Sequence, residues 1–182
     1  MNIIQYFKEG AIGVMLTDTV YGLVAKASDK QAVAKLYALK NREHKPGTVI
    51  AYDVKQLREM GIKSRHLVLP GNYWPNPLSV MVPVTNDLNY LALGKGSLAV
   101  RIPKDPRVLD LLRLSGPVLT TSANQSGQPF ARNIKEAKKY FGSRVDFYID
   151  DGDSLNHQPS TIIKITNDRI EILRDGEYKF KL

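Results

Sequence analysis

The sequence predicts an α/β fold, a twisted mixed sheet with flanking helices, and two observations support this. Short apolar runs with strand composition alternate with segments of helical periodicity along the chain. In addition, residues 165–170 show a hairpin pattern with Asn167 and Asp168 at the turn, which adds antiparallel pairing. At 182 residues we expect a single domain covering 1–182.

Helices are expected where a capping residue precedes an apolar repeat and a glycine follows it. The candidates are residues 2–9, a helix after a capping box at 28–31, a helix from Asp105 to Gly116, and a basic helix from Asn133 to Gly142. Strands are expected in the apolar runs between them. These runs are residues 11–16, 48–52, 78–83, 97–102, 118–121, 145–149 and 161–165.

The composition excludes several classes of functional site and favours an anionic partner. Cysteine is absent, which excludes disulfide scaffolds, thiol catalysis and Cys-ligated zinc. Lys and Arg number 26 against 18 Asp and Glu, and the resulting charge of +8 favours an anionic partner such as a nucleotide or nucleic acid. Neither a signal peptide nor an apolar run long enough for a membrane is found, so a cytoplasmic protein without a membrane partner is expected. P-loop, Rossmann and metal-hydrolase motifs are also missing.

Polar clusters follow several of the predicted strands. Residues 17–23 and 120–127 combine hydroxyls with glycine, as small polar ligands require, although ordinary turns have the same composition. Lys40 and Arg42 could bind one phosphate chain or simply form a solvated charged end of a helix. Arg101 lies in an apolar run, so it needs either a carboxylate partner within the protein or a carboxylate ligand.

Seven short motifs occur in an order that resembles the YrdC-like family of threonylcarbamoyl-AMP synthases. They are LTDTVYGL (16–23), KNR (40–42), WPNPLS (74–79), VRIP (100–103), TSANQSG (121–127), STI (160–162) and RDG (174–176). Together they cover nearly the whole chain, and TSANQSG is the most specific of them.

The resemblance implies a YrdC-like fold with a large basic concave cavity, of the short single-domain bacterial type. It implies an enzyme, a nucleotidyltransferase, that makes L-threonylcarbamoyladenylate and pyrophosphate from L-threonine, bicarbonate and ATP with Mg²⁺. A separate transfer complex, of the TsaB, TsaD and TsaE type, would then use this product for threonylcarbamoyladenosine in tRNA.

Site residues follow from the resemblance by position. Its implied catalytic quartet is Lys40, Arg42, Ser122 and Asn124, which would also contact ATP. Further ATP contacts fall on Ser97 and Arg174, and threonine contacts fall on Thr19, Arg101, Thr120 and Ser160. No metal ligand and no general base is indicated.

The chain departs from the family pattern at several motif positions. These are Leu16 for Pro, Asp18 for Glu, Glu43 for Pro, Asn76 for Gly, Ser79 for Thr and Phe130 for Ser. Two alternatives stay open: a carbamoyl-adenylate-forming enzyme of the same family, and a non-catalytic RNA-binding module that uses the basic segment 132–139. A weak tRNA contact beside synthesis is also compatible with the charge.

Overall fold

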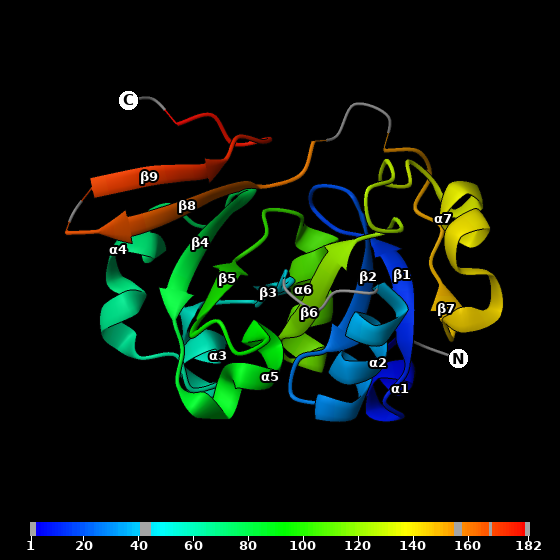
Figure 1. Cartoon of the computed structure of the whole chain (residues 1–182), viewed down its shortest axis with the longest axis horizontal. Coiled ribbons are helices and arrows are strands. Elements are labelled where there is room, and N and C mark those ends of the chain that lie inside the picture. The colour runs from blue at the N-terminus through cyan, green and yellow to red at the C-terminus, as the bar shows by residue number, and fades with distance from the viewer. Residues whose placement is uncertain (1–2, 41–44, 155–157, 168, 181–182) are drawn as a thin grey trace.

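In the computed structural model of the chain, a single mixed sheet runs through the molecule (Figure 1). The structure describes residues 3–40, 45–154, 158–167 and 169–180. The order of the strands in the sheet is β7-β1-β2-β6-β3-β5-β4-β8-β9. Their bounds are β1 Ile12–Leu16, β2 Tyr21–Lys26, β3 Thr48–Ile50, β4 Leu78–Pro83, β5 Ser97–Arg101, β6 Val118–Ser122, β7 Phe147–Tyr148, β8 Thr161–Thr166 and β9 Arg169–Arg174.

Parallel and antiparallel pairs alternate irregularly across this sheet. β1 with β7, β3 with β5, and β4 with β8 are parallel, whereas the other neighbouring pairs are antiparallel. The sheet is therefore mixed, as the sequence predicts. Its mixed character comes from the β1–β2 hairpin and the β6 pairings as well as from the predicted β8–β9 hairpin.

Helices flank the sheet on both faces. They are α1 Ile3–Lys8, α2 Lys30–Lys40, α3 Val54–Glu59, α4 Val68–Gly71, α5 Asn89–Ala92, α6 Pro106–Ser115 and α7 Ile134–Phe141. Short 3₁₀ turns lie at Ser64–His66, Asn86–Leu88 and Gly142–Arg144. Buried side chains of α2 and α7 pack in one apolar cluster, and those of α1 and α6 pack in another.

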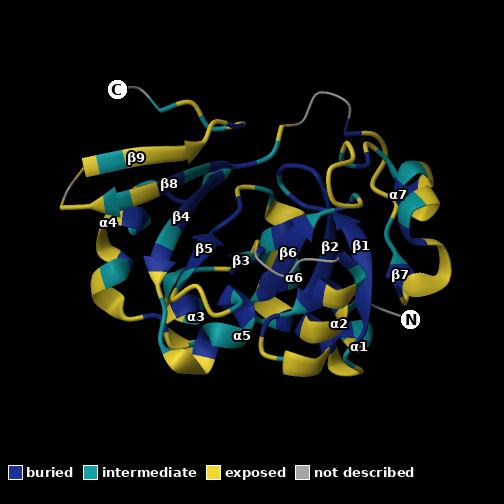
Figure 2. Ribbon diagram, in the orientation of Figure 1, coloured by how far each residue is buried: buried dark blue, intermediate teal, exposed yellow. Residues whose placement is uncertain are grey.

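The strand β1 shows why the sheet needs cover on both sides. Its neighbouring residues Val14 and Met15 point to opposite faces and belong to different apolar clusters. All five residues of β1 are buried, and Figure 2 shows the central strands as the dark core of the molecule. Complete burial of each such large apolar side chain stabilises the fold by roughly 1.5–3 kcal/mol.

Local signals explain where the helices begin and end. Asp105 accepts a hydrogen bond from the Arg107 amide at the start of α6, and Asn133 caps α7 in the same way through the Glu136 amide. Gly116 and Gly142 end these two helices, so both predicted helices are confirmed.

One expectation needs correction. The capping residue of α2 is Asp29, which accepts from the amides of Gln31 and Ala32, rather than Ser28. The composition of residues 17–23 is also that of an ordinary turn, yet the second half of this segment begins β2 at Tyr21. A threonine pair and a glycine are typical of turns, and only pairing with β1 and β6 makes this segment a strand.

Within the described residues, no helix combines the length and the apolar character that a membrane crossing requires.

Candidate functional site

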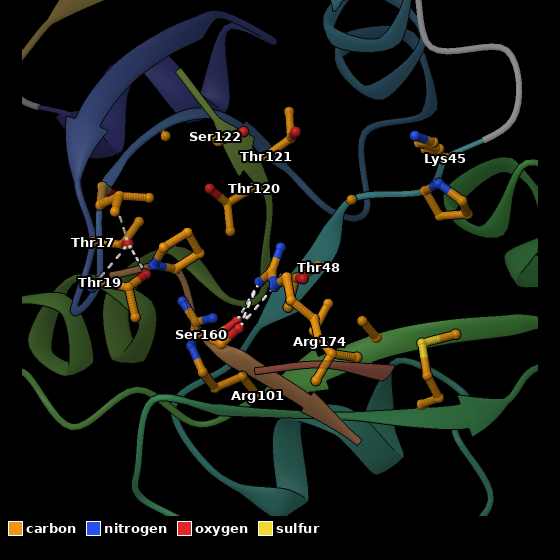
Figure 3. Close-up of a pocket in the computed structure, with 18 residues that line it drawn as sticks. Thr17, Thr19, Lys45, Thr48, Arg101, Thr120, Thr121, Ser122, Ser160 and Arg174 are labelled. Carbon is orange, nitrogen blue, oxygen red and sulfur yellow. Dashed lines mark hydrogen bonds between the residues drawn. The ribbon is translucent and has the colours of Figure 1, made fainter. Parts of the chain in front are cut away.

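A cavity of about 310 Å³ lies over one face of the sheet (Figure 3). It crosses strands that neighbour one another in the order β2-β6-β3-β5-β4-β8-β9. Its lining residues are Thr17, Thr19, Val20, Gly22, Lys45, Pro46, Gly47, Thr48, Met81, Ala99, Arg101, Thr120, Thr121, Ser122, Pro159, Ser160, Ile162 and Arg174. Hydroxyls and cations dominate its polar surface, which suits a ligand with several anionic or hydrogen-bonding oxygens.

Arg101 ends β5 and forms an ion pair with Asp18, which lies in the turn between β1 and β2. Its Nη2 is 2.8 Å from the Asp18 Oδ1, and the two side chains are 3% and 2% exposed. The sequence left open whether this cation has a partner in the protein or in a ligand; the structure supplies a partner in the protein. Among the described residues, Arg101 Nε and Asp18 Oδ2 are buried without a hydrogen-bond partner.

Ser79, Ser160 and Arg174 continue this polar network along the cavity. Ser79 Oγ is 3.2 Å from Arg101 Nη1 and 2.9 Å from Ser160 Oγ. Arg174 donates from Nε and Nη2 to the Ser160 carbonyl at 3.0 and 2.7 Å, and from Nη2 to Ser160 Oγ at 3.1 Å. Two guanidinium groups, one in the middle of the chain and one near its C-terminus, are thereby linked through two serine hydroxyls.

The glycine of the RDG motif makes this link possible. A Cβ atom at Gly176 would lie 2.7 Å from the carbonyl carbon of Ser160 and 2.8 Å from its oxygen. The chain after β9 can therefore approach the backbone before β8 closely only without a side chain at this position. This close approach holds Arg174 against Ser160.

The turn between β1 and β2 also contributes two threonines to the cavity lining. The Thr17 and Thr19 hydroxyls are 3.1 Å apart, and Thr17 also donates to the Val20 carbonyl at 2.9 Å. Gly22 follows in β2, where a Cβ atom would clash with the Thr120 hydroxyl of β6. Thr120 can therefore reach the cavity beside this turn because residue 22 is glycine.

Tyr21 holds a further segment in place. Its hydroxyl donates to the Gly152 carbonyl at 2.7 Å and accepts from the Asp151 amide at 3.0 Å. Burial raises the pKa of Tyr21, and the Asp150, Asp151 and Asp153 carboxylates raise it further, against the opposing effect of the Asp151 amide.

Lys40 has a different surrounding from the cavity cations. It ends α2, is 2% exposed, and does not line the cavity. Its ammonium donates to the Ser122 carbonyl at 2.7 Å and to both the carbonyl and the side-chain oxygen of Asn124. Ser122 Oγ also donates to Asn124 Oδ1 at 2.8 Å, so Lys40 holds the end of β6 and the residues that follow it.

The structure brings most of the predicted site residues together. Thr19, Arg101, Thr120, Ser122, Ser160 and Arg174 line the cavity, and Lys40 and Asn124 contact Ser122 without lining it. Arg42 lies outside the described residues. Ser97 does not line the cavity, since it is two residues before Ala99, about 7 Å farther along β5.

Several cavity residues were not singled out from the sequence. Asp18 belongs to the polar cluster 17–23 and Ser79 to the WPNPLS motif, but the sequence assigns neither of them a contact with Arg101. The acidic residue in an otherwise apolar and hydroxyl-rich segment was a usable signal, because a buried cation elsewhere in the chain needed a carboxylate. Lys45 and Thr48 also line the cavity and carried no comparable signal.

The described residues include no cluster of three or more His, Cys, Asp or Glu side chains that could hold a metal ion. The cations that line the cavity within that part of the chain are Lys45, Arg101 and Arg174. Whether the cavity as a whole is as large and basic as the sequence resemblance implies stays a prediction.

Comparison with known proteins gives concordant similarities. The family profile Sua5_yciO_yrdC, described as "Telomere recombination", matches residues 5–176. The threonylcarbamoyl-AMP synthase of Pseudoalteromonas translucida is 31% identical over 169 residues, which cover 89% of this chain and 90% of that protein. The threonylcarbamoyl-AMP synthase of Cellvibrio japonicus is 34% identical over 148 residues, 76% of each.

The fold has a solved counterpart as well. The crystal structure of P. abyssi Sua5 complexed with L-threonine superposes with a TM-score of 0.84 and 29% identity. The superposition covers 96% of this chain and 53% of that one, so this chain spans about half the length of that protein.

Proposed function

The chain belongs to the Sua5/YciO/YrdC family, and from this premise we propose that it is a threonylcarbamoyl-AMP synthase that acts in threonylcarbamoyladenosine formation on tRNA. As a nucleotidyltransferase it would join L-threonine, bicarbonate and ATP into L-threonylcarbamoyladenylate and pyrophosphate. The observation that carries the proposal is the pair of guanidinium groups, Arg101 and Arg174, that lie among hydroxyls at the cavity, where the ion pair with Asp18 uses only Nη2 of Arg101. An amino-acid carboxylate is the ligand chemistry that such a group recognises.

The threonine site would lie between the β1–β2 turn and β8. Arg101 would bind the carboxylate, and Thr19, Thr120 and Ser160 would hold the remaining polar groups. The co-crystallised L-threonine in the P. abyssi Sua5 structure supports a threonine site in this fold. Arg174 and Lys45 supply positive charge on the same cavity for the phosphates of ATP.

The reaction joins three substrates in two bond-forming steps. The free amine of threonine attacks the carbon of bicarbonate, and water leaves to give a carbamate. A carbamate oxygen then attacks the α-phosphorus of ATP, and pyrophosphate leaves with the bond electrons. Mg²⁺ would enter with ATP, bound by phosphate oxygens and water, and would neutralise charge on the leaving group.

In this proposal the protein contributes mainly placement and positive charge, which together can supply several kcal/mol of the barrier reduction. Lys40 would act by holding the Ser122–Asn124 backbone in position, and its contacts with three oxygens there support this role. Arg42 stays a predicted phosphate contact. The product would pass to a separate transfer complex of the TsaB, TsaD and TsaE type.

The direct test measures pyrophosphate release from ATP and Mg²⁺ with bicarbonate, in the presence and absence of L-threonine. We expect release that depends on threonine, and identification of the adenylate by mass spectrometry. Pyrophosphate release at the same rate without threonine would overturn the assignment as a threonylcarbamoyl-AMP synthase. Carbamoyl phosphate in place of bicarbonate and threonine tests the alternative of a carbamoyl-adenylate-forming enzyme. That reaction does not need threonine, so pyrophosphate release with carbamoyl phosphate alone would favour it.

Lys40→Ala tests the placement of the Ser122–Asn124 segment. It should lower the rate by ~10–1000-fold if that segment positions the phosphates. Lys35→Ala is the matched control, because Lys35 is exposed on the same helix. Equal rates for the two variants would remove Lys40 from the proposed site.

The alternative of a non-catalytic RNA-binding module is not favoured. Most of its basic segment lies in α7, and Arg132, just before that helix, pairs with Glu136 at 2.8 Å at the surface. Such a face is ordinary for a solvated helix. Binding of ATP and threonine in the absence of RNA would discriminate the two functions.

A further inference from the structure

Ser79, the first of the two serines that link the cavity arginines, has a fixed direction of hydrogen bonding. Ser79 lies in β4, is 0% exposed, and is flanked by the buried residues Leu78 and Val80. A hydroxyl in such a place is costly unless its hydrogen and its lone pairs are used. Among the described residues its partners are Arg101 Nη1 and Ser160 Oγ.

The direction follows from what each partner can do. A guanidinium only donates, so Ser79 Oγ accepts from Arg101. The hydrogen of the Ser79 hydroxyl must then go to Ser160 Oγ, which is 2.9 Å away. Ser160 Oγ also accepts from Arg174 Nη2 at 3.1 Å, because that group too only donates.

Ser160 therefore accepts twice, and its own hydrogen is left for a third partner. Ser160 lines the cavity and is 2% exposed, so this hydrogen is available there as a fixed donor (Figure 3). A hydrogen-bond donor that is fixed between two positively charged guanidinium groups favours binding of an anionic oxygen. It disfavours an ammonium group, which is itself a positively charged donor.

We propose that Ser79 is a positioning residue that fixes Ser160 as a hydrogen-bond donor to a carboxylate or phosphate oxygen and couples Arg101 to Arg174. This inference rests on the proposed function for the identity of the ligands, but its geometry does not. With Ser79 in place, a ligand that orders Arg101 also orders Ser160 and Arg174, so threonine and ATP strengthen each other's binding. Ser79 itself touches neither substrate.

The first test measures this coupling by calorimetry. The affinity for L-threonine is determined with and without a non-hydrolysable ATP analogue and Mg²⁺, and the ratio is the coupling factor. We expect a factor of at least ~5 in the unmodified protein, as is common for coupled sites, and a factor near 1 in Ser79→Ala. Ser79→Thr, which keeps the hydroxyl and restores the residue of the family pattern, should retain the coupling.

Ser154→Ala is the matched control for a lost buried serine. Ser154 is 1% exposed, and its hydroxyl donates to the Arg132 carbonyl at 3.0 Å, outside the cavity lining. It should leave the coupling factor unchanged. Equal coupling in Ser79→Ala and the unmodified protein, or an equal loss in Ser154→Ala, would overturn the proposal.

A second measurement needs no substrate and separates this proposal from the proposed function. Nitrogen NMR signals of the Arg101 and Arg174 side chains are recorded in the free protein. Ser79→Ala should move both signals, although Arg174 does not contact Ser79, because the change passes through Ser160. If the Arg174 signal stays in place, the link does not exist, whatever the protein binds. If both signals move but threonine does not bind, the proposed function fails and the link stands.

Discussion

Two aspartate–arginine pairs in this protein have nearly the same length and opposite settings. Asp18 and Arg101 meet at 2.8 Å with side chains that are 2% and 3% exposed. Asp105 and Arg107 meet at 3.0 Å, with Asp105 22% and Arg107 65% exposed. The first joins distant parts of the chain beside the cavity, and the second closes the first turn of α6.

The difference teaches that contact distance alone does not rank ion pairs. Charges at the surface keep most of their hydration, so pairing them adds little. Charges taken out of water lose that hydration, and each becomes costly if its partner is removed. The buried pair is therefore a constraint on the cavity, whereas the surface pair is a modest addition to a helix cap.

The largest expected effect comes from breaking the buried pair. Arg101→Met leaves the Asp18 carboxylate buried without its partner and should lower the free energy of unfolding by about 3–5 kcal/mol. Urea denaturation followed by circular dichroism measures it. The double variant Asp18→Leu with Arg101→Met should recover most of the stability without recovering threonine binding. A loss below about 1 kcal/mol in the single variant would show that the two pairs are equivalent.

An intermediate effect is expected at the helix cap. Asp105→Ala removes the acceptor for the Arg107 amide and should lower the free energy of unfolding by about 1 kcal/mol. The same urea titration applies. Asp105→Asn is the control, because asparagine caps helices as well as aspartate does and should lose much less. A loss as large as that of Arg101→Met would contradict the ranking.

A smaller effect is expected from the exposed arginine. Arg107→Ala should change the free energy of unfolding by less than about 1 kcal/mol. In about 1 M NaCl this difference should shrink further, since the Debye length falls to roughly 3 Å, whereas the effect of Arg101→Met should persist. Paired urea titrations at low and high salt test both statements, and an unscreened Arg107 effect would argue against an exposed pair.

The smallest effect is a pH dependence. Partial burial alone would raise the pKa of Asp105, but hydrogen bonds and charge from Arg107 outweigh it and lower the pKa from 3.8. The stabilisation that the ionised Asp105 carboxylate contributes is therefore present above pH 3.8. It is lost as the pH falls through the lower pKa that this carboxyl has in the folded protein. The stability difference between the unmodified protein and Asp105→Asn should vanish over this acidic range. A difference that stays constant down to pH 2 would mean that the carboxylate charge does not contribute.

The sequence predicts different parts of this molecule unequally well. Helices with local caps, such as α6 after Asp105 and α7 after Asn133, could be predicted because the cap and the end signal lie within one short segment. The strand β2 could not, since Tyr21 and Gly22 become a strand only by pairing with β1 and β6. Side-chain composition favours a turn there, and tertiary pairing overrides it.

The site shows the same limit. A buried Arg101 that needs a carboxylate could be inferred from the apolar residues around it. Asp18 can supply this carboxylate only because the strand register across β1, β2, β6, β3 and β5 brings it next to Arg101. That register is a property of the whole sheet. Lys40 shows a related limit, because its contacts with the Ser122 and Asn124 oxygens could not be inferred from the sequence, whereas its role as a phosphate contact stays a prediction.

The strand order has a kinetic consequence. β6 pairs with β2 and β3, β8 pairs with β4, and the cavity draws on residues from Thr17 to Arg174, so most of its contacts join segments far apart along the chain. Such contacts form only after large loops have closed, which makes folding slow in comparison with helical proteins of the same size. The last link, Arg174 with Ser160, requires β8 and β9 to be in place. We therefore expect binding competence to appear in the final phase of refolding, after the central strands have become protected from hydrogen exchange.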